Sequence, residues 1–270
     1  MIKQVKPKKN LGQHFLTDES IALSIANTVD ACPDLPVLEI GPGMGVLTKY
    51  LVKKQRPFKA VEIDKESVDY LHAAYPSLQE NVISNDFLTM NLNDVFNGKS
   101  FVLTGNYPYD ISSQIFFKML DYKHLIPCCT GMIQKEVALR MSSATGNKAY
   151  GILSVLIQAW YNVEYLFTVD EHVFNPPPKV KSAVIRMTRN NVEDLGCNET
   201  LFKRVVKTVV NQRRKMLRVS LKQMFTMGVA RNDFYTQEVM TKRPEQLSVA
   251  QFVELTNIVE QEMKWIEENK

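Results

Sequence analysis

Apolar and polar positions alternate along this chain in two ways, one typical of buried strands and the other of amphipathic helices. Short apolar runs predict strands over residues 37–40, 58–63, 81–85, 100–104 and 131–134. Helical spacing between these runs predicts helices over residues 46–53, 65–74, 112–120 and 135–141. Another helix is expected over residues 19–30, with Asp18 as its N-cap. Strands and helices that alternate over short connections predict a mostly parallel sheet flanked by helices.

The pattern changes in the last third of the chain. Two more strand-like stretches, residues 163–169 and 181–187, follow a polar loop. The composition then shifts near residues 188–198, and the remaining sequence has helical periodicity without a convincing strand. We therefore predict an α/β domain over residues 1–188, with a basic N-terminal arm, and a small all-α domain over residues 189–270.

A glycine-rich turn follows the first predicted strand of the sheet. Gly41, Gly43 and Gly45 lie between this strand and the next helix, where glycines allow a sharp turn and close approach of a ligand. Glu62 stands 21 positions after Gly41, at the end of the second strand, where a carboxylate can accept hydrogen bonds from ribose hydroxyls. The glycines alone could serve a tight turn, but together with Glu62 they favour a nucleoside-containing cofactor.

The glycine spacing separates two cofactors. It is G-x-G-x-G, whereas the dinucleotide loop is G-x-G-x-x-G and holds a pyrophosphate at a helix N-terminus. S-adenosylmethionine has no phosphate, so the spacing favours it over NAD. Asp86 ends the third strand, where its carboxylate can accept from the adenine amine, although capping of a helix is an equally plausible role.

An Asn-x-Pro-Tyr segment follows the fourth strand, at the edge of the sheet where ligands bind. The side-chain oxygen of Asn106 and the backbone carbonyl of Tyr107 can accept from an adenine amine, and Pro108 forms a turn. Tyr109 can stack on the base. Phe174 lies beside a run of prolines and could face the other side of a flipped base; a core phenylalanine beside a turn is the simpler interpretation.

The composition and the cysteines exclude several other classes of protein. Hydrophobic residues make up 45% and charged residues 23%, which excludes a disordered or collagen-like chain. No cysteine pair has C-x-x-C spacing, so we expect neither a zinc site nor a disulfide framework, but reduced thiols in a cytoplasmic protein. We expect no metal, and no apolar run is long enough to predict a secretory signal or a membrane span.

Several segments in this order resemble the ribosomal RNA adenine dimethyltransferase family, most closely its bacterial small-subunit branch. The matching segments are residues 9–16, 39–45, 61–64, 106–109, 174–184, 212–218 and 243–247. The resemblance implies N6,N6-dimethylation of two adjacent adenosines in a hairpin near the 3′ end of small-subunit (16S) rRNA. It also implies a Rossmann-like methyltransferase domain followed by a small helical domain, S-adenosylmethionine as the methyl donor and an assembling 30S subunit as the partner. We expect the enzyme to be a monomer.

The resemblance also assigns the site. The cofactor contacts that it implies are His14, Leu16, Gly41, Gly43, Glu62, Asp86 and Asn106. The catalytic residues that we expect are Asn106, Tyr107, Pro108, Tyr109 and Phe174. Two positions depart from the family: residue 14 is histidine where many members have asparagine, and residue 107 is tyrosine where leucine or phenylalanine is more familiar. The role of the Tyr107 ring is therefore open.

Positive charge is concentrated in the predicted helical domain. The net charge is only +4, but residues 200–224 hold eight basic residues and no acid. Solvated helix faces usually mix both signs, so this cluster favours binding to RNA phosphates over a merely soluble helix. The residues that we expect to contact RNA are Lys8, Lys9, Arg213, Arg214, Lys215 and Arg218.

Three other functions share parts of this pattern. A methyltransferase that acts on large-subunit rRNA would have the same fold, but the segments at residues 212–218 and 243–247 favour the small subunit. A ribosome-assembly factor whose binding matters more than its methylation is compatible with everything above. A nicotinamide-dependent oxidoreductase is disfavoured by the glycine spacing and the Asn-x-Pro-Tyr segment.

Overall fold

The structure, a computed structural model, describes residues 4–270 and divides into two compact units. The first unit takes the chain up to Leu139 together with Tyr161–Asn190, and the second comprises Arg140–Trp160 and Asn191–Lys270. No helix among the described residues is long and apolar enough to cross a membrane.

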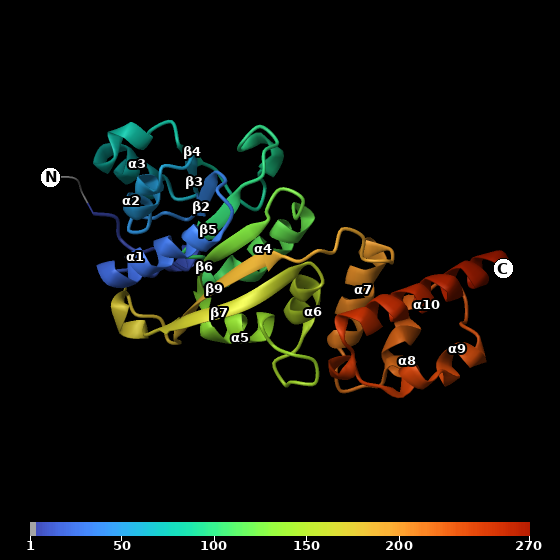
Figure 1. The fold of residues 1–270 in the computed structure, drawn as a ribbon. Helices are drawn as coiled ribbons and strands as arrows, with labels where there is room; N and C mark the ends of the chain where they lie inside the picture. The colour runs from blue at the N-terminus through green and yellow to red at the C-terminus, as the bar shows by residue number, and fades with distance from the viewer. Residues whose placement is uncertain (1–3) are drawn as a thin grey trace. The chain divides into compact units, whose positions relative to one another are not determined.

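The first unit is built on a seven-stranded sheet in the order β4-β3-β2-β5-β6-β9-β7 (Figure 1). The strands are β2 (Val37–Ile40), β3 (Phe58–Glu62), β4 (Val82–Ser84), β5 (Val102–Gly105), β6 (Cys128–Gln134), β7 (Tyr161–Val169) and β9 (Ser182–Arg189). The pairs from β4 to β6 are parallel, and β9 is antiparallel to both β6 and β7. The predicted α/β class with a mostly parallel sheet is confirmed.

Helices connect and cover the strands of this sheet. They are α1 (Glu19–Asn27), α2 (Thr48–Leu51), α3 (Lys65–Ala74), α4 (Ser112–Asp121) and α5 (Lys135–Met141), and α5 reaches into the second unit. Asp18 caps α1 as predicted, because its carboxylate accepts from the backbone N–H groups of Ser20 and Ile21. The helix predicted over residues 46–53 is shorter, because the glycine turn extends to Leu47 and the last residues form a 3-10 turn.

A two-stranded antiparallel sheet joins two segments that are far apart in the sequence. Strand β1 (Phe15–Leu16) pairs with β8 (Phe174–Asn175), so that Leu16 lies opposite Phe174. The side chains of Leu16 and Phe174 are buried in one apolar cluster with α1 and β2. The basic arm is therefore anchored to the first unit by its last residues.

The second unit is helical. It contains α6 (Ile152–Gln158), α7 (Glu199–Val210), α8 (Leu217–Ser220), α9 (Asn232–Thr236) and α10 (Val249–Glu268). The rings of Trp160 and Phe202 meet edge to face at 5.9 Å in its core. Helix α6 has no counterpart in the sequence prediction, because its apolar run I-L-S-V-L-I fits a strand as well as a helix.

One cysteine pair differs from the prediction. Cys32 and Cys128 are joined by a disulfide, with their Cα atoms 5.8 Å apart, so the expectation of reduced thiols is wrong for these two. They are 96 residues apart in the sequence and come together because the turn after α1 packs against β6. Cys129 and Cys197 are free thiols.

Candidate active site

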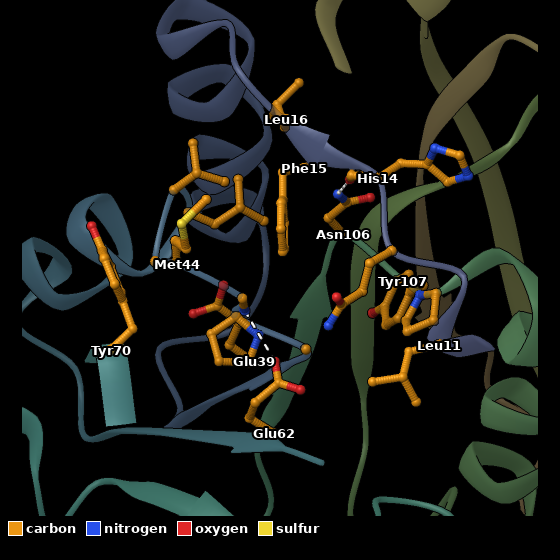
Figure 2. Close-up of a pocket in the computed structure, with 18 of the residues that line it drawn as sticks. Leu11, His14, Phe15, Leu16, Glu39, Met44, Glu62, Tyr70, Asn106 and Tyr107 are labelled. Carbon is orange, nitrogen blue, oxygen red and sulfur yellow. Dashed lines mark hydrogen bonds between the residues drawn. The ribbon is translucent and has the colours of Figure 1, made fainter. Parts of the chain in front are cut away.

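A pocket of about 280 Å³ opens at the carboxyl ends of β2, β3 and β5, where parallel sheets bind their ligands (Figure 2). The N-terminal arm, the glycine turn, the end of β3 and the segment that follows β5 contribute most of its lining, and single residues of α1, β2, α2 and α3 complete it. The predicted site residues that line this pocket are His14, Leu16, Gly41, Gly43, Glu62, Asn106, Tyr107, Pro108 and Tyr109.

The glycine turn is fixed against both the arm and β3. Gly43 has a φ of +55°, in the left-handed region, and a Cβ at this position would lie 3.1 Å from the Phe15 ring. Its backbone N–H donates to Glu62 Oε2 at 3.0 Å. A side chain at position 43 would therefore both strain the turn and push the arm away from it.

Glu62 ends β3 with its carboxylate held by the backbone. Oε2 accepts from Gly43, and Oε1 accepts from the N–H of Asp64 at 2.9 Å. The side chain is buried, which raises the pKa of its carboxyl, while the two N–H donors oppose that rise. Each oxygen keeps a lone pair, so the carboxylate has the two acceptors that a ribose diol requires.

Glu39 is a functional candidate that the sequence prediction missed. It lies in the middle of β2, only 1% exposed, and lines the same pocket. Thr48 donates its hydroxyl to Glu39 Oε2 at 2.7 Å, but burial raises the pKa of the carboxyl to about 8. The sequence did contain a signal for this residue, because Glu39 is an acid within an otherwise apolar central strand. A cationic ligand in the pocket would favour its ionised form.

Asn106 bridges the end of β5 to the arm. Its backbone pairs with Met132, and its side-chain Nδ2 donates to the carbonyl of His14 at 3.4 Å (Figure 2). The amide is thereby oriented with Nδ2 toward the arm, and Oδ1 has no hydrogen-bond partner among the described residues. Oδ1 can therefore accept a hydrogen bond from an adenine amine in the pocket.

The Tyr107 ring is an anchor of the fold. It is 1% exposed, donates its hydroxyl to the carbonyl of Thr130 at 2.8 Å, and meets Phe116 edge to face at 5.4 Å. Burial raises its pKa well above the ordinary value. A Cβ at Gly131 would lie 2.7 Å from this ring, so glycine is required for the ring to fit. The ring holds the Asn-x-Pro-Tyr segment in place, so any catalytic role of Tyr107 belongs to its backbone carbonyl.

His14 contacts the Asn-x-Pro-Tyr segment through its ring. The imidazole stacks on Tyr109 with centroids 5.5 Å apart, and its Nδ1 lies 2.8 Å from the carbonyl of Pro176. Because a carbonyl only accepts, Nδ1 carries the proton in this arrangement. Figure 2 shows the imidazole directed away from Glu62. Tyr109 is also held at its other end, by a hydrogen bond between its hydroxyl and that of Ser182.

Two predicted site residues lie outside this pocket. Asp86 is not among its lining residues, and its Oδ1 accepts from the N–H of Leu88 at 2.8 Å, so it caps a turn and not the helix of the alternative interpretation. Phe174 is 4% exposed within the apolar core, as in the alternative of a core phenylalanine. The roles of both in the reaction stay predictions.

The predicted RNA contacts fall into two groups. Lys8, in the arm, forms ion pairs with Asp64 and Glu66, so it is already paired within the first unit. Lys9 is exposed beside it. In the helical unit Arg213 donates to the carbonyl of Lys148 at 3.0 Å. The exposed members there are Arg214, Lys215 and Arg218.

The sheet, the glycine turn and the acid at the end of β3 define a methyltransferase that uses S-adenosylmethionine. The donor set at the pocket fits this cofactor, because it offers a carboxylate for the ribose, a glycine turn with G-x-G-x-G spacing, and a buried acid that a cationic group would ionise. The sequence profile described as "Ribosomal RNA adenine dimethylase" matches residues 4–261, and the chain belongs to this family. It is therefore an enzyme that methylates adenines of ribosomal RNA.

Individual proteins agree with this assignment. A protein of Phocaeicola vulgatus named "Ribosomal RNA small subunit methyltransferase A" is 66% identical over 96% of this chain and 92% of its own length. The crystal structure of a dimethyladenosine transferase from Plasmodium falciparum has a TM-score of 0.74 at 23% identity, covering 94% of this chain and 98% of that one. The 23S rRNA methyltransferase ErmE has a TM-score of 0.62 at 27% identity, covering 92% and 100%.

Proposed function

We propose that this enzyme transfers two methyl groups to each of two adjacent adenosines in a hairpin near the 3′ end of small-subunit (16S) rRNA. The observation that carries the proposal is that one pocket holds both a ribose-binding acid, Glu62, and an amide with a free acceptor, Asn106. The choice of the small subunit is supported by the name of the 66% identical relative.

Some residues of the pocket hold the methyl donor, and others orient the adenine that accepts the methyl group. When bound, S-adenosylmethionine supplies an electrophilic methyl group on its sulfonium. Glu62 would accept from the ribose hydroxyls, and the glycine turn would lie against the cofactor. In the first transfer Asn106 Oδ1 and the carbonyl of Tyr107 accept the two N6 hydrogens of the adenine, and in the second transfer one of them accepts the single hydrogen that remains. These contacts turn the nitrogen lone pair toward the methyl group, and one N6 proton leaves to water after each transfer.

The target base must leave its helix to reach this pocket. Tyr109 offers one ring face for stacking, while His14 and Ser182 hold the ring in position. Stacking of a base on an aromatic ring is worth about 1–3 kcal/mol, which offsets part of the cost of unstacking the base.

Binding to the subunit is assigned to the basic residues of the helical domain. We assign this role to residues 189–270, with Arg213, Arg214, Lys215 and Arg218 at RNA phosphates, and we propose that the enzyme binds the assembling 30S subunit as a monomer in the cytoplasm. The predicted contacts Asp86 and Phe174 belong to the same proposal, Asp86 toward the adenine amine of the cofactor and Phe174 toward the flipped base.

The substrate is tested by transfer of tritiated methyl groups from S-adenosylmethionine to small and large ribosomal subunits that lack the modification. We expect the label in small subunits, recovered as N6,N6-dimethyladenosine at two adjacent positions. Label in large subunits instead would favour a 23S rRNA target, the RNA named for the structural neighbour ErmE. Binding to small subunits without any transfer would favour an assembly factor.

A further inference from the structure

A second pocket lies in the helical unit, and apart from Arg218 the proposed function does not use the residues that line it. It has a volume of about 670 Å³ and is bounded by α8, the 3-10 turn Leu221–Met224, the following loop and α9. Its lining includes Arg218, Lys222, Phe225, Asn232 and Tyr235. All of these residues belong to the second unit, so the pocket does not depend on the methyltransferase fold.

Two aromatic rings of this pocket are held in place by a third, buried ring. Phe225 meets Phe234 edge to face at 5.0 Å, and Phe234 meets Tyr235 in the same way at 5.0 Å. Phe234 is 2% exposed, whereas Phe225 and Tyr235 are half-buried. The two outer rings therefore have fixed positions while part of each surface stays accessible, which suits stacking of a planar ligand.

The charged side chains that line the pocket, Arg218 and Lys222, are cations. Arg218 and Lys222 are exposed, and neither forms an ion pair with an acid among residues 4–270. The Lys222 ammonium lies 5.8 Å from the centre of the Tyr235 ring. The nearby buried acid, Glu262, is already paired with Arg231 at 2.8 Å, so it does not neutralise the pocket.

The pocket also has a polar side chain and a fixed wall. Asn232 is exposed at its edge and carries an amide, the group that pairs with adenine in nucleic-acid recognition. The loop that lines the pocket passes so close to α10 that a Cβ at Gly228 would lie 2.6 Å from Ile266. The next residue, Val229, is 85% exposed and gives the rim an apolar edge.

We propose that this pocket binds an unpaired nucleotide of the ribosomal RNA, at a position other than the methylated adenosines. The base stacks against Phe225 and Tyr235, Asn232 meets its edge, and Arg218 and Lys222 meet the adjoining phosphate. Accessible aromatic rings next to cations without an acidic partner are the combination that binds single-stranded nucleic acid. The inference rests on the proposed function only in taking ribosomal RNA as the ligand.

The test combines binding with base protection on small subunits that lack the methylation. Tyr235→Leu removes the ring, and Tyr235→Phe is the matched control that keeps it. We expect Tyr235→Leu to raise the Kd for the subunit by about 5- to 160-fold, as loss of one stacked base would. We expect Tyr235→Phe to bind as the wild type does. Asn232→Ala, an exposed change, gives a second variant if Tyr235→Leu melts early.

Chemical probing then identifies the ligand. At saturating protein, the wild type and Tyr235→Phe should protect an unpaired base outside the target hairpin, and Tyr235→Leu and Asn232→Ala should not. Lys222→Gln should flatten the log-affinity against log-salt slope by about 0.7–0.9, whereas Lys264→Gln, a charge removal on α10, should do so less. Weaker binding without any such base would mean that a ribosomal protein fills the pocket, and would overturn the proposal.

The test separates this inference from the proposed function. The inference alone would be overturned if the wild-type enzyme methylates small subunits while folded pocket variants bind them, and protect their bases, as the wild type does. Wild-type enzyme that binds the subunits through this pocket but transfers no methyl group would overturn the proposed function alone.

Discussion

Two glutamates on neighbouring strands, Glu39 and Glu62, are both buried but differ in their hydrogen bonds. Glu62 accepts from two backbone N–H groups, whereas Glu39 accepts only one hydroxyl, from Thr48, among the described residues. The burial that they share raises both pKa values, and for Glu39 the value reaches about 8. At the scale of single residues, the chemistry of the pocket therefore depends on how each carboxyl is solvated.

Glu62→Gln tests the ribose contact. The variant keeps the size of the side chain but presents an amide N–H₂ to one of two backbone donors, and it loses the charge. We expect the Kd for S-adenosylmethionine to rise about 10- to 150-fold, as for loss of a hydrogen bond to a charged group. Calorimetric titration measures it, with thermal melting as the control for folding. Unchanged affinity in a folded variant would remove Glu62 from the site.

Glu39→Gln tests the buried acid through pH. Because the folded pKa near 8 lies above the ordinary 4.5, the native protein binds more protons than the unfolded chain between these values. Stability contributed by this group is present below about pH 4.5 and is lost as the pH rises toward 8. We expect the melting temperature of Glu39→Gln to rise relative to wild type between pH 5.5 and 8.5. Parallel curves would contradict the raised pKa.

Tyr107→Phe separates the ring from the backbone at this position. The buried hydroxyl that bonds Thr130 is lost, so we expect a stability decrease of about 1–2 kcal/mol, measured by denaturant unfolding. The single-turnover rate should stay unchanged, because the proposed catalytic group is the carbonyl. A rate that falls while the fold stays intact would give the hydroxyl a direct role.

At the scale of elements, the two short strands β1 and β8 bring the arm, the proline run and the Asn-x-Pro-Tyr segment together. The sequence indicated that all three segments are parts of the site. The spacing between the glycine turn and Glu62 was sufficient to predict that these two lie together. It could not show that His14 turns its ring onto Tyr109, because that contact depends on the pairing of residues about 160 apart. The Cys32–Cys128 disulfide was not predicted either, because the two cysteines are 96 residues apart in the sequence.

His14→Ala tests whether this ring positions Tyr109 or binds the cofactor. The stacking and the bond to Pro176 favour a positioning role. We therefore expect weaker productive binding of the RNA, seen as a lower kcat/KM, with unchanged affinity for S-adenosylmethionine. His14→Asn restores the residue familiar in the family but not the stacking, so it should share the RNA defect. A loss confined to cofactor affinity would support the direct contact implied by the resemblance.

At the scale of the whole molecule, the two units have different charges and different proposed tasks. The apolar pattern predicted the sheet and the helical end, because periodicity reports burial. It did not predict α6 or the grouping of residues 140–160 with the helical unit, because short apolar runs do not reveal which unit buries them. Methyl transfer is assigned to the first unit and RNA docking to the second.

Reversal of two basic charges tests this division. Arg214 and Arg218 are exposed in the helical unit, far in sequence from the cofactor motifs. Changing both to Glu should spare affinity for S-adenosylmethionine, weaken binding to small subunits, and flatten the salt slope by about 0.7–0.9 per lost phosphate contact. Normal melting with an unchanged slope would show that the RNA docks elsewhere.

The central claim is that Asn106 orients the adenine nitrogen for transfer, and a single-turnover experiment with Asn106→Ala tests it most directly. Enzyme saturated with S-adenosylmethionine is mixed with unmodified small subunits, and N6-methylated adenosines are followed with time. We expect the rate constant to fall about 100-fold, because misplacement of a reacting group costs that much, while subunit affinity is kept. A rate close to that of the wild type in a folded, cofactor-saturated variant would contradict the account.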